Sequence, residues 1–348
     1  MRREGPFDRL FAAFAFGRSY WFLLLARVLQ GVGSSCSAVA GMGMLAERYP
    51  EDRERGIAMG IALGGLAFGC VIGPTFGGVM YEFVGKSSPF VVLAALALAD
   101  AILQLLILQP KMKRQELARP SLKQLLKDPY ICIAAGGLLF GNMVFAVLEP
   151  TLPSWMERTM CAAIWQQGAV YLACSILYLI GTNVFPPLGH KIGRWLVTML
   201  GFIFMGISMV FVPEANNVWL ILGPLAGLGF STAMVDTSIM PELARLVDLR
   251  HSPIYGTVYA VGDVAFCLGF AVALYDPSLQ MQRKRNAGEM SRLLGNFLLC
   301  LLAGPAFAGA LVQGIGFDWM LYVMAIVCFL YSPLFSFLRN PPARGEKR

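Results

Sequence analysis

The chain has 348 residues, of which 57% are hydrophobic and 14% are charged. A soluble globular domain carries about 25% charged residues, so this composition excludes an ordinary soluble protein. The formal net charge of +7 does not indicate a nucleic-acid partner, because the basic residues fall in short stretches between apolar runs. Most of the cysteines lie inside those runs, where they behave as small hydrophobic residues, and no disulfide framework is predicted.

Apolar runs of about 20 residues recur along the chain, which is the length a helix needs to cross a hydrocarbon core of about 30 Å. Unbroken runs of this kind favour helices over a β-barrel. We therefore predict an all-α polytopic membrane protein, with spans near 19–41, 57–83, 89–108, 130–150, 166–188, 195–213, 218–240, 255–275, 293–313 and 317–337.

The basic residues predict the orientation of these spans. The connection 109–128 is strongly basic, which places it in the cytosol by the positive-inside rule. Alternation then predicts that 46–55, 189–194 and 241–251 are cytosolic and that 84–88, 156–165 and 214–217 lie on the opposite side. Beyond residue 255 the rule fails, because Arg283, Lys284 and Arg285 would lie outside the cytosol if 255–275 and 293–313 both span.

The stretch 57–83 carries a pattern of small residues, G-x3-G-P-x2-G-G, formed by Gly69, Gly73, Pro74, Gly77 and Gly78. Glycines four residues apart give a helix a flat stripe that lets another helix approach closely, and a proline bends the helix. Ordinary tight packing explains a single such pair. The full pattern resembles the antiporter motif in the fifth helix of the major facilitator superfamily, which implies coupled exchange.

The same pattern returns late in the chain if residues 273–303 are removed. Gly269-Phe-Ala-Val is then followed directly by Gly304-Pro-Ala-Phe-Ala-Gly, which matches the stretch 69–78. Parallel repeats of this kind build the two halves of major facilitator transporters. We therefore expect an insertion at 273–303 and a fold that lacks the first three of twelve helices. The predicted parts are 1–109 (helices equivalent to 4–6), a cytosolic linker at 110–128, and a C-terminal half at 129–348.

Ionisable residues inside the predicted spans are functional candidates, because a charge in the bilayer costs several kcal/mol. They are Arg27, Asp100, Glu149, Asp236 and Asp263. Asn142 lies seven residues before Glu149, which places both on one helix face. A carboxylate shielded from water can alternate between holding a proton and pairing with a cation. Pairing of an acid with Arg27 for helix contacts is the alternative, and for Asp100 we favour such a structural role.

Four aromatic residues, Trp155, Tyr178, Tyr259 and Phe266, lie on the same or neighbouring segments as these acids. An aromatic face favours an ammonium ligand, although an aromatic residue in a span usually serves packing. His251 flanks a span, and its ordinary titration range suits proton handling as well as a solvated loop position.

Several stretches resemble the vesicular monoamine transporters, including Leu148-Glu-Pro-Thr-Leu-Pro-Ser-Trp155, Tyr178-Leu-Ile-Gly-Thr-Asn183, Met234-Val-Asp236 and Tyr255-Gly-Thr-Val-Tyr259-Ala-Val-Gly-Asp263. The resemblance implies a transporter rather than an enzyme, without cofactor or metal. It implies exchange of cytosolic monoamines for vesicular protons supplied by the vesicular proton-pumping ATPase. It also implies residence in secretory or synaptic vesicle membranes, with a cytosolic C-terminus if 273–303 adds no span.

The resemblance further implies residue roles. Asn142, Glu149, Trp155, Tyr178, Tyr259 and Phe266 would line an amine and inhibitor pocket. Glu149, Asp236, Asp263 and His251 would handle coupling protons, and Arg27 would belong to a central polar network. Two alternatives stay open: a non-transporting isoform, suggested by the expected loss of three helices, and a broad-specificity drug/proton antiporter, which the glycine motif would also serve.

Overall fold

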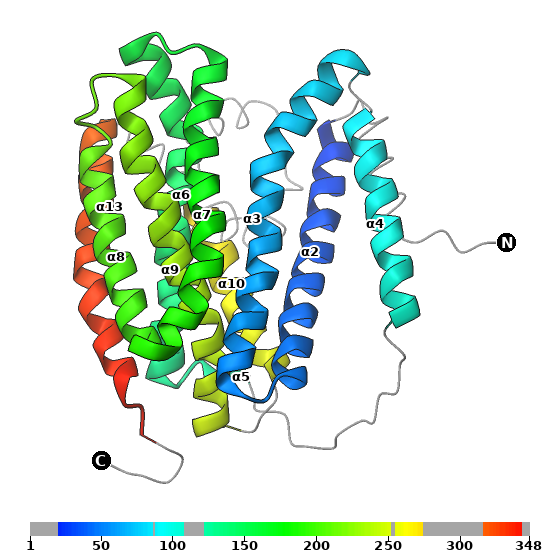
Figure 1. Cartoon of the computed structure of the whole chain (residues 1–348), viewed down its shortest axis with the longest axis vertical. Helices are drawn as coiled ribbons and strands as arrows, with labels where there is room; N and C mark the ends of the chain where they lie inside the picture. The colour runs from blue at the N-terminus through cyan, green and yellow to red at the C-terminus, as the bar shows by residue number, and fades with distance from the viewer. Residues whose placement is uncertain (1–19, 86–87, 108–121, 252–254, 274–315, 343–348) are drawn as a thin grey trace, which may run out of the picture. The chain divides into compact units, whose positions relative to one another are not determined.

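The structure is a computed structural model that describes residues 20–85, 88–107, 122–251, 255–273 and 316–342. Every regular element in this part of the chain is helical (Figure 1). The elements are α2 (Tyr20–Arg48), α3 (Asp52–Phe83), α4 (Ser88–Ile107), α5 (Leu122–Leu125), α6 (Pro129–Met160), α7 (Ile164–Ile192), α8 (Arg194–Phe211), α9 (Val218–Arg250), α10 (Tyr255–Ala273), α13 (Phe317–Tyr331) and the 3-10 helix η1 (Ser332–Arg339).

The predicted all-α membrane fold is confirmed. Within the described residues, seven helices are long and apolar enough to cross a membrane, and two shorter apolar helices, Ser88–Gln104 and Tyr255–Phe270, accompany them. Nearly every predicted span falls on one of these helices. The span predicted at 293–313 and the insertion expected at 273–303 lie outside the described residues, apart from Ala273 at the end of α10.

Several predicted connections turn out to be helical. Residues 52–55 open α3, with Asp52 and Glu54 in its first turn, and most of 241–251 belongs to α9. The connection 189–194 shrinks to Gly193, whose positive φ of 98° allows a sharp turn between α7 and α8. Hydropathy marks only the part of a helix inside the hydrocarbon, so it misses polar turns that extend beyond it.

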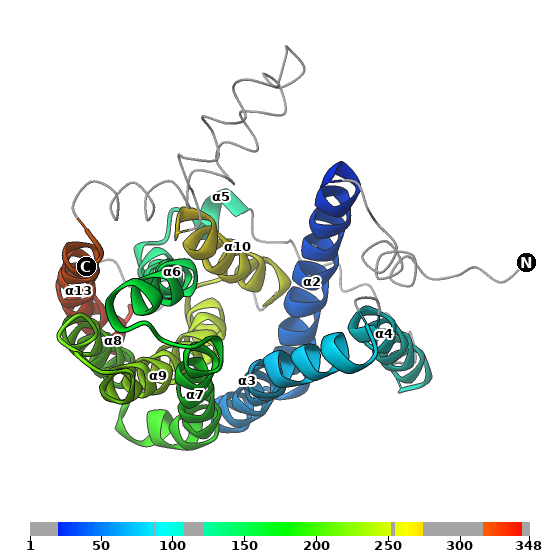
Figure 2. The ribbon, with the colours of Figure 1, turned by 90° about the horizontal axis from the view of Figure 1, so that it is seen from above.

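The chain forms two compact units, the first from residues 1–41 and 69–118 and the second from residues 42–68 and 119–348. The second unit holds the two polar regions and the cavity described below. At its centre α9 lies between α7 and α8, as seen from above in Figure 2, and α6 packs against α10.

Glycines allow close helix crossings in the second unit. A Cβ on Gly229 of α9 would collide with the backbone carbonyl of Cys174 in α7, and one on Gly269 would collide with the Leu139 carbonyl of α6. A Cβ on Gly201 of α8 would lie 3.0 Å from Met234. These crossings follow the small-residue packing of membrane helices.

The predicted glycine stripe behaves differently. No described atom lies within 4 Å of a Cβ built on Gly69, Gly73 or Gly77. These glycines belong to the first unit, and the expected backbone-to-backbone approach at this motif stays a prediction. Pro74 and Gly78 lie within α3.

Candidate functional site

The centre of α9 buries an acid. All residues from Ser231 to Ile239 are buried, and Asp236 is 4% exposed. The Tyr178 hydroxyl of α7 donates a hydrogen bond of 3.1 Å to Oδ2 of Asp236. Oδ1 of Asp236 has no hydrogen-bond partner among the described residues. A buried carboxylate with a free oxygen is costly, so it needs a functional reason.

Asn142 of α6 adjoins this carboxylate. It is 4% exposed, and its Nδ2 donates 2.8 Å to the carbonyl of Leu138 in its own helix. Three helices thus contribute to one polar point, which we call the central acid cluster: Asn142, Tyr178 and Asp236. Among the described residues no hydrogen bond or ion pair joins a basic side chain to Asp236, so the cluster can accept a proton or an ammonium ion.

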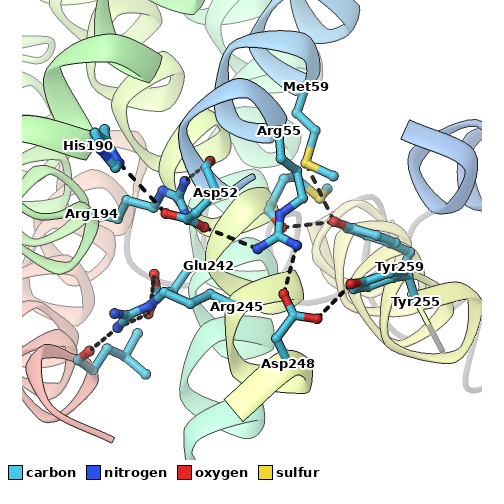
Figure 3. Close-up of polar contacts among 12 residues, drawn as sticks. Asp52, Arg55, Met59, His190, Arg194, Glu242, Arg245, Asp248, Tyr255 and Tyr259 are labelled. Carbon is cyan, nitrogen blue, oxygen red and sulfur yellow. Dashed lines mark hydrogen bonds and ion pairs between the residues drawn. The ribbon is translucent and has the colours of Figure 1, made fainter. Parts of the chain in front are cut away.

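A second polar region lies at the ends of the spans and joins α3, α8, α9 and α10 (Figure 3). We call it the end network. Arg55 is only 1% exposed and donates 2.7 Å to Oδ2 of Asp248 and 3.1 Å to Oδ1 of Asp52. Arg194 donates 2.8 Å to the same oxygen of Asp52, and Tyr255 donates 2.6 Å to Oδ1 of Asp248.

The sequence analysis missed this network. Its charged members lay in stretches predicted as connections, where basic residues were used only for orientation. The available signal was the pairing of Arg55 with Asp52 three residues earlier, on one helix face. The partners Arg194 and Asp248 are far away in sequence and carried no such signal.

Tyr259 and His251 lie with the helix ends rather than with Asp236. The buried Tyr259 hydroxyl donates 3.5 Å to Sδ of Met59 and 3.4 Å to the carbonyl of Met240, beside the end network (Figure 3). Nε2 of His251 lies 3.0 Å from Oδ2 of Asp128, the residue that caps the N-terminus of α6. The structure therefore gives His251 a helix-end contact.

The other predicted residues are dispersed. Glu149 is exposed although Asn142 on the same helix is buried, so the two do not share one environment. Trp155 stacks on Phe317 at 4.8 Å, and Phe266 packs on Phe270 at 5.3 Å. The expected gathering of these rings around acids is found among the described residues only for Tyr178.

The remaining charged candidates stay close to their own helices. Asp263 is half-buried, with no hydrogen bond or ion pair recorded to any described residue. Arg27 is exposed and donates 3.1 Å to Gln30, and its place in a central network stays a prediction. Asp100 accepts 2.8 Å from Gln104, in line with a structural role. No group of three metal-binding side chains occurs in the part of the chain that the structure describes.

Comparison with known proteins decides the family. The family model described as Major Facilitator Superfamily matches residues 10–274. The chain belongs to the major facilitator superfamily. The human organic anion transporter MFSD10 (TETRAN) shares this fold, with a TM-score of 0.71 at 14% identity over 94% of this chain and 74% of that chain.

Within the superfamily, the resemblance to vesicular amine transporters is confirmed. The chain is 51% identical to the synaptic vesicular amine transporter of Mus musculus and 50% identical to the chromaffin granule amine transporter of Homo sapiens. The vesicular acetylcholine transporter of Torpedo torpedo is 36% identical. Each amine transporter matches 96% of this chain, and the chain spans 58–59% of their length.

Proposed function

We propose that the protein acts in vesicular monoamine/proton antiport. It would exchange cytosolic dopamine, serotonin, noradrenaline, adrenaline or histamine for lumenal protons across the membrane of secretory or synaptic vesicles. A vesicular proton-pumping ATPase would supply the gradient, and no cofactor or metal would take part. The similarity to vesicular amine transporters supports this proposal.

One structural observation carries the proposal: Oδ1 of the buried Asp236 has no partner among the described residues. In a low-dielectric site, a carboxylate is stabilised either by a proton or by a cationic ligand, and the two compete for it. Such competition at one carboxylate couples amine movement to proton movement. Tyr178 orients the carboxylate through Oδ2 and offers an aromatic face to an ammonium group.

Further roles belong to the same proposal. Glu149 and Asp263 would act as additional coupling carboxylates, because neither side chain has a recorded ion pair among the described residues. Trp155, Tyr259 and Phe266 would shape the amine pocket. The inhibitors reserpine and tetrabenazine would bind there, as the resemblance implies.

The test is uptake of labelled serotonin into liposomes that hold the protein and have an acidic lumen. Asp236→Asn keeps the size of the side chain but cannot alternate between charge states, so we expect uptake to be abolished. Ser238→Ala is the matched control, because Ser238 is buried on the same helix and its hydroxyl has no hydrogen-bond partner among the described residues.

Two results would count against the proposal. Normal uptake by Asp236→Asn at equal protein density would remove Asp236 from the mechanism. A wild-type protein that folds but accumulates no amine with the gradient imposed would contradict the antiport function itself. An equal loss of amine uptake in Asp236→Asn and Ser238→Ala would mean that transport is sensitive to any change in this part of α9. The carboxylate of Asp236 would then have no demonstrated role of its own.

A further inference from the structure

A cavity of about 260 Å³ opens at the ends of α3, α7, α8, α9 and η1. A water molecule occupies about 30 Å³ of liquid, so one or two trapped waters would not fill this space. Figure 3 shows the contacts of Asp52 with Arg194 and of Glu242 with Arg245, four residues that belong to its lining. Its lining consists of Asp52, Gly189, His190, Gly193, Arg194, Trp195, Glu242, Arg245 and Arg339.

The lining carries more positive than negative charge. Three arginines face two carboxylates, and both carboxylates already have partners. Asp52 accepts from Arg194 at 2.8 Å, and Glu242 accepts from Arg245 at 2.8 and 3.0 Å. The third arginine, Arg339, forms no ion pair with a carboxylate of the described residues. Its guanidinium lies 5.5 Å from the centroid of the Trp195 ring.

The backbone adds to this positive character. Helix α8 starts at Arg194, and its N-cap residue Gly193 provides no side-chain hydrogen bond to the first amide groups. The first N–H groups of a helix carry partial positive charge and favour an anion. The cavity therefore combines the start of α8, which has no side-chain cap, with a guanidinium that has no carboxylate partner in the part of the chain that the structure describes.

The length and composition of the surrounding helices indicate that the cavity lies near the level where a membrane changes from hydrocarbon to headgroups. Most of its lining residues occur at the ends of candidate spans, which run over Asp52–Gly73, Gln166–Ile192, Arg194–Phe211 and Phe317–Arg339. Large apolar side chains close to these ends are exposed: Leu188, Ile192 and Phe337. Tryptophan, here Trp195, is common at this depth of a membrane.

We propose that this cavity binds the phosphate group of an anionic phospholipid. Arg339 contacts the phosphate, Trp195 holds the guanidinium in place, and the acyl chains lie along Leu188, Ile192 and Phe337. The basic connections predict that this end faces the cytosol, and the cytoplasmic leaflet is where anionic lipids gather. The lipid would join η1 to the start of α8, independently of amine transport.

The proposal is tested by native mass spectrometry of the protein taken from nanodiscs of phosphatidylcholine with and without phosphatidylinositol 4-phosphate. We expect the protein to retain the anionic lipid selectively. Loss of one interfacial arginine weakens attraction to anionic lipid about fivefold, so Arg339→Gln should lower the retained lipid by about that factor. Arg339→Lys keeps the charge and should retain most of it.

The matched control is Arg48→Gln, which removes an exposed charge near the same helix ends without touching the cavity. Equal losses in Arg48→Gln and Arg339→Gln would show a general surface-charge effect and overturn the proposal. Inorganic phosphate that displaces the lipid completely would show that a soluble anion is the ligand and overturn the lipid assignment.

A measurement on the wild-type protein covers the case in which Arg339→Gln fails to fold. Phenylglyoxal modifies accessible arginines, and peptide mapping reports the modification at Arg339. We expect phosphatidylinositol 4-phosphate in the nanodisc to protect Arg339 but not Arg48. Equal modification of Arg339 with and without the anionic lipid would overturn the proposal.

Discussion

The central acid cluster and the end network both place carboxylates between helices and use them in opposite ways. In the end network each carboxylate has a guanidinium: Asp248 has Arg55, and Asp52 has both Arg55 and Arg194. In the central acid cluster, Asp236 has one hydroxyl and a free oxygen. A fully paired charge fixes helices against each other, whereas a carboxylate without a cation can take up a ligand.

The largest expected effect comes from breaking the end network. Arg55→Met removes a guanidinium that is 1% exposed and leaves Asp52 and Asp248 short of a partner. Removal of one partner from a fully buried ion pair costs about 3–5 kcal/mol. The side chains of Asp52 and Asp248 are 37% and 33% exposed, so we expect the loss to lie at the lower end of that range. We expect a lower melting temperature in detergent and in liposomes.

The control for this prediction is Arg53→Met, because Arg53 is an exposed arginine in the same turn of α3. If both variants melt like the wild type, the end network contributes nothing to stability. Its difference from the central acid cluster would then be one of position only.

The second effect concerns helix packing. Gly229→Ala forces a Cβ against the backbone carbonyl of Cys174, which cannot move away cheaply. Overpacking of this kind costs about 1–3 kcal/mol. Gly73→Ala is the matched variant, since a Cβ there meets open space among the described residues, and it should change the melting temperature little. A larger drop in melting temperature for Gly73→Ala than for Gly229→Ala would support the packing role predicted for the glycine motif.

These contrasts explain how far sequence reasoning reached. The spans were predictable because a helix that crosses lipid needs about 20 consecutive apolar residues. Such a run can be recognised from the local sequence alone. The sequence placed Tyr178 on a segment near predicted acids but did not name its partner, and the structure shows that its hydroxyl donates to Asp236. The end network was not predictable in this way, because its strongest pairs join residues more than 100 positions apart, as with Arg55 and Asp248.

The glycine motif and the rings show what a sequence pattern leaves open. A stripe of small residues shows that close approach is possible but does not say which helix packs against it, whereas the contacts of Gly229 and Gly269 are seen directly within the second unit. The position of an aromatic residue near an acid in the sequence likewise does not say which side chain the ring contacts. Trp155 stacks on Phe317, which lies in a different part of the chain from any of the predicted acids.

The third effect is expected at Tyr178 and concerns amine affinity rather than the stability of the fold. Tyr178→Phe removes the only hydrogen bond from a described side chain to Oδ2 of Asp236 and keeps the ring. A hydrogen bond to a charged group contributes about 1.5–3 kcal/mol, so amine affinity should change by a factor of at least 10 if the carboxylate loses its orientation. Tyr178→Ala, which also removes the aromatic face, should weaken amine binding further, by about 1–2 kcal/mol.

Equilibrium binding of labelled amine measures both Tyr178 variants. Phe266→Ala is the comparison, because its ring packs on Phe270 and has no recorded contact with Asp236. If Phe266→Ala weakens binding as much as Tyr178→Ala and Tyr178→Phe has no effect, aromatic faces alone recognise the amine. The orientation of Asp236 would then be irrelevant to binding.

The smallest expected change in stability belongs to Asp236→Asn, the variant expected to abolish uptake. The asparagine keeps an oxygen that can accept from Tyr178, and its neutral amide removes the cost of holding a charge in a buried site. We therefore expect the melting temperature to stay the same or to rise, corresponding to about 1 kcal/mol or less. Arg55→Met would lose stability while Asp236→Asn would lose transport, and this separation is what the comparison of the two regions requires. A strongly destabilised Asp236→Asn protein would mean that the central carboxylate, like those of the end network, is held mainly for structure.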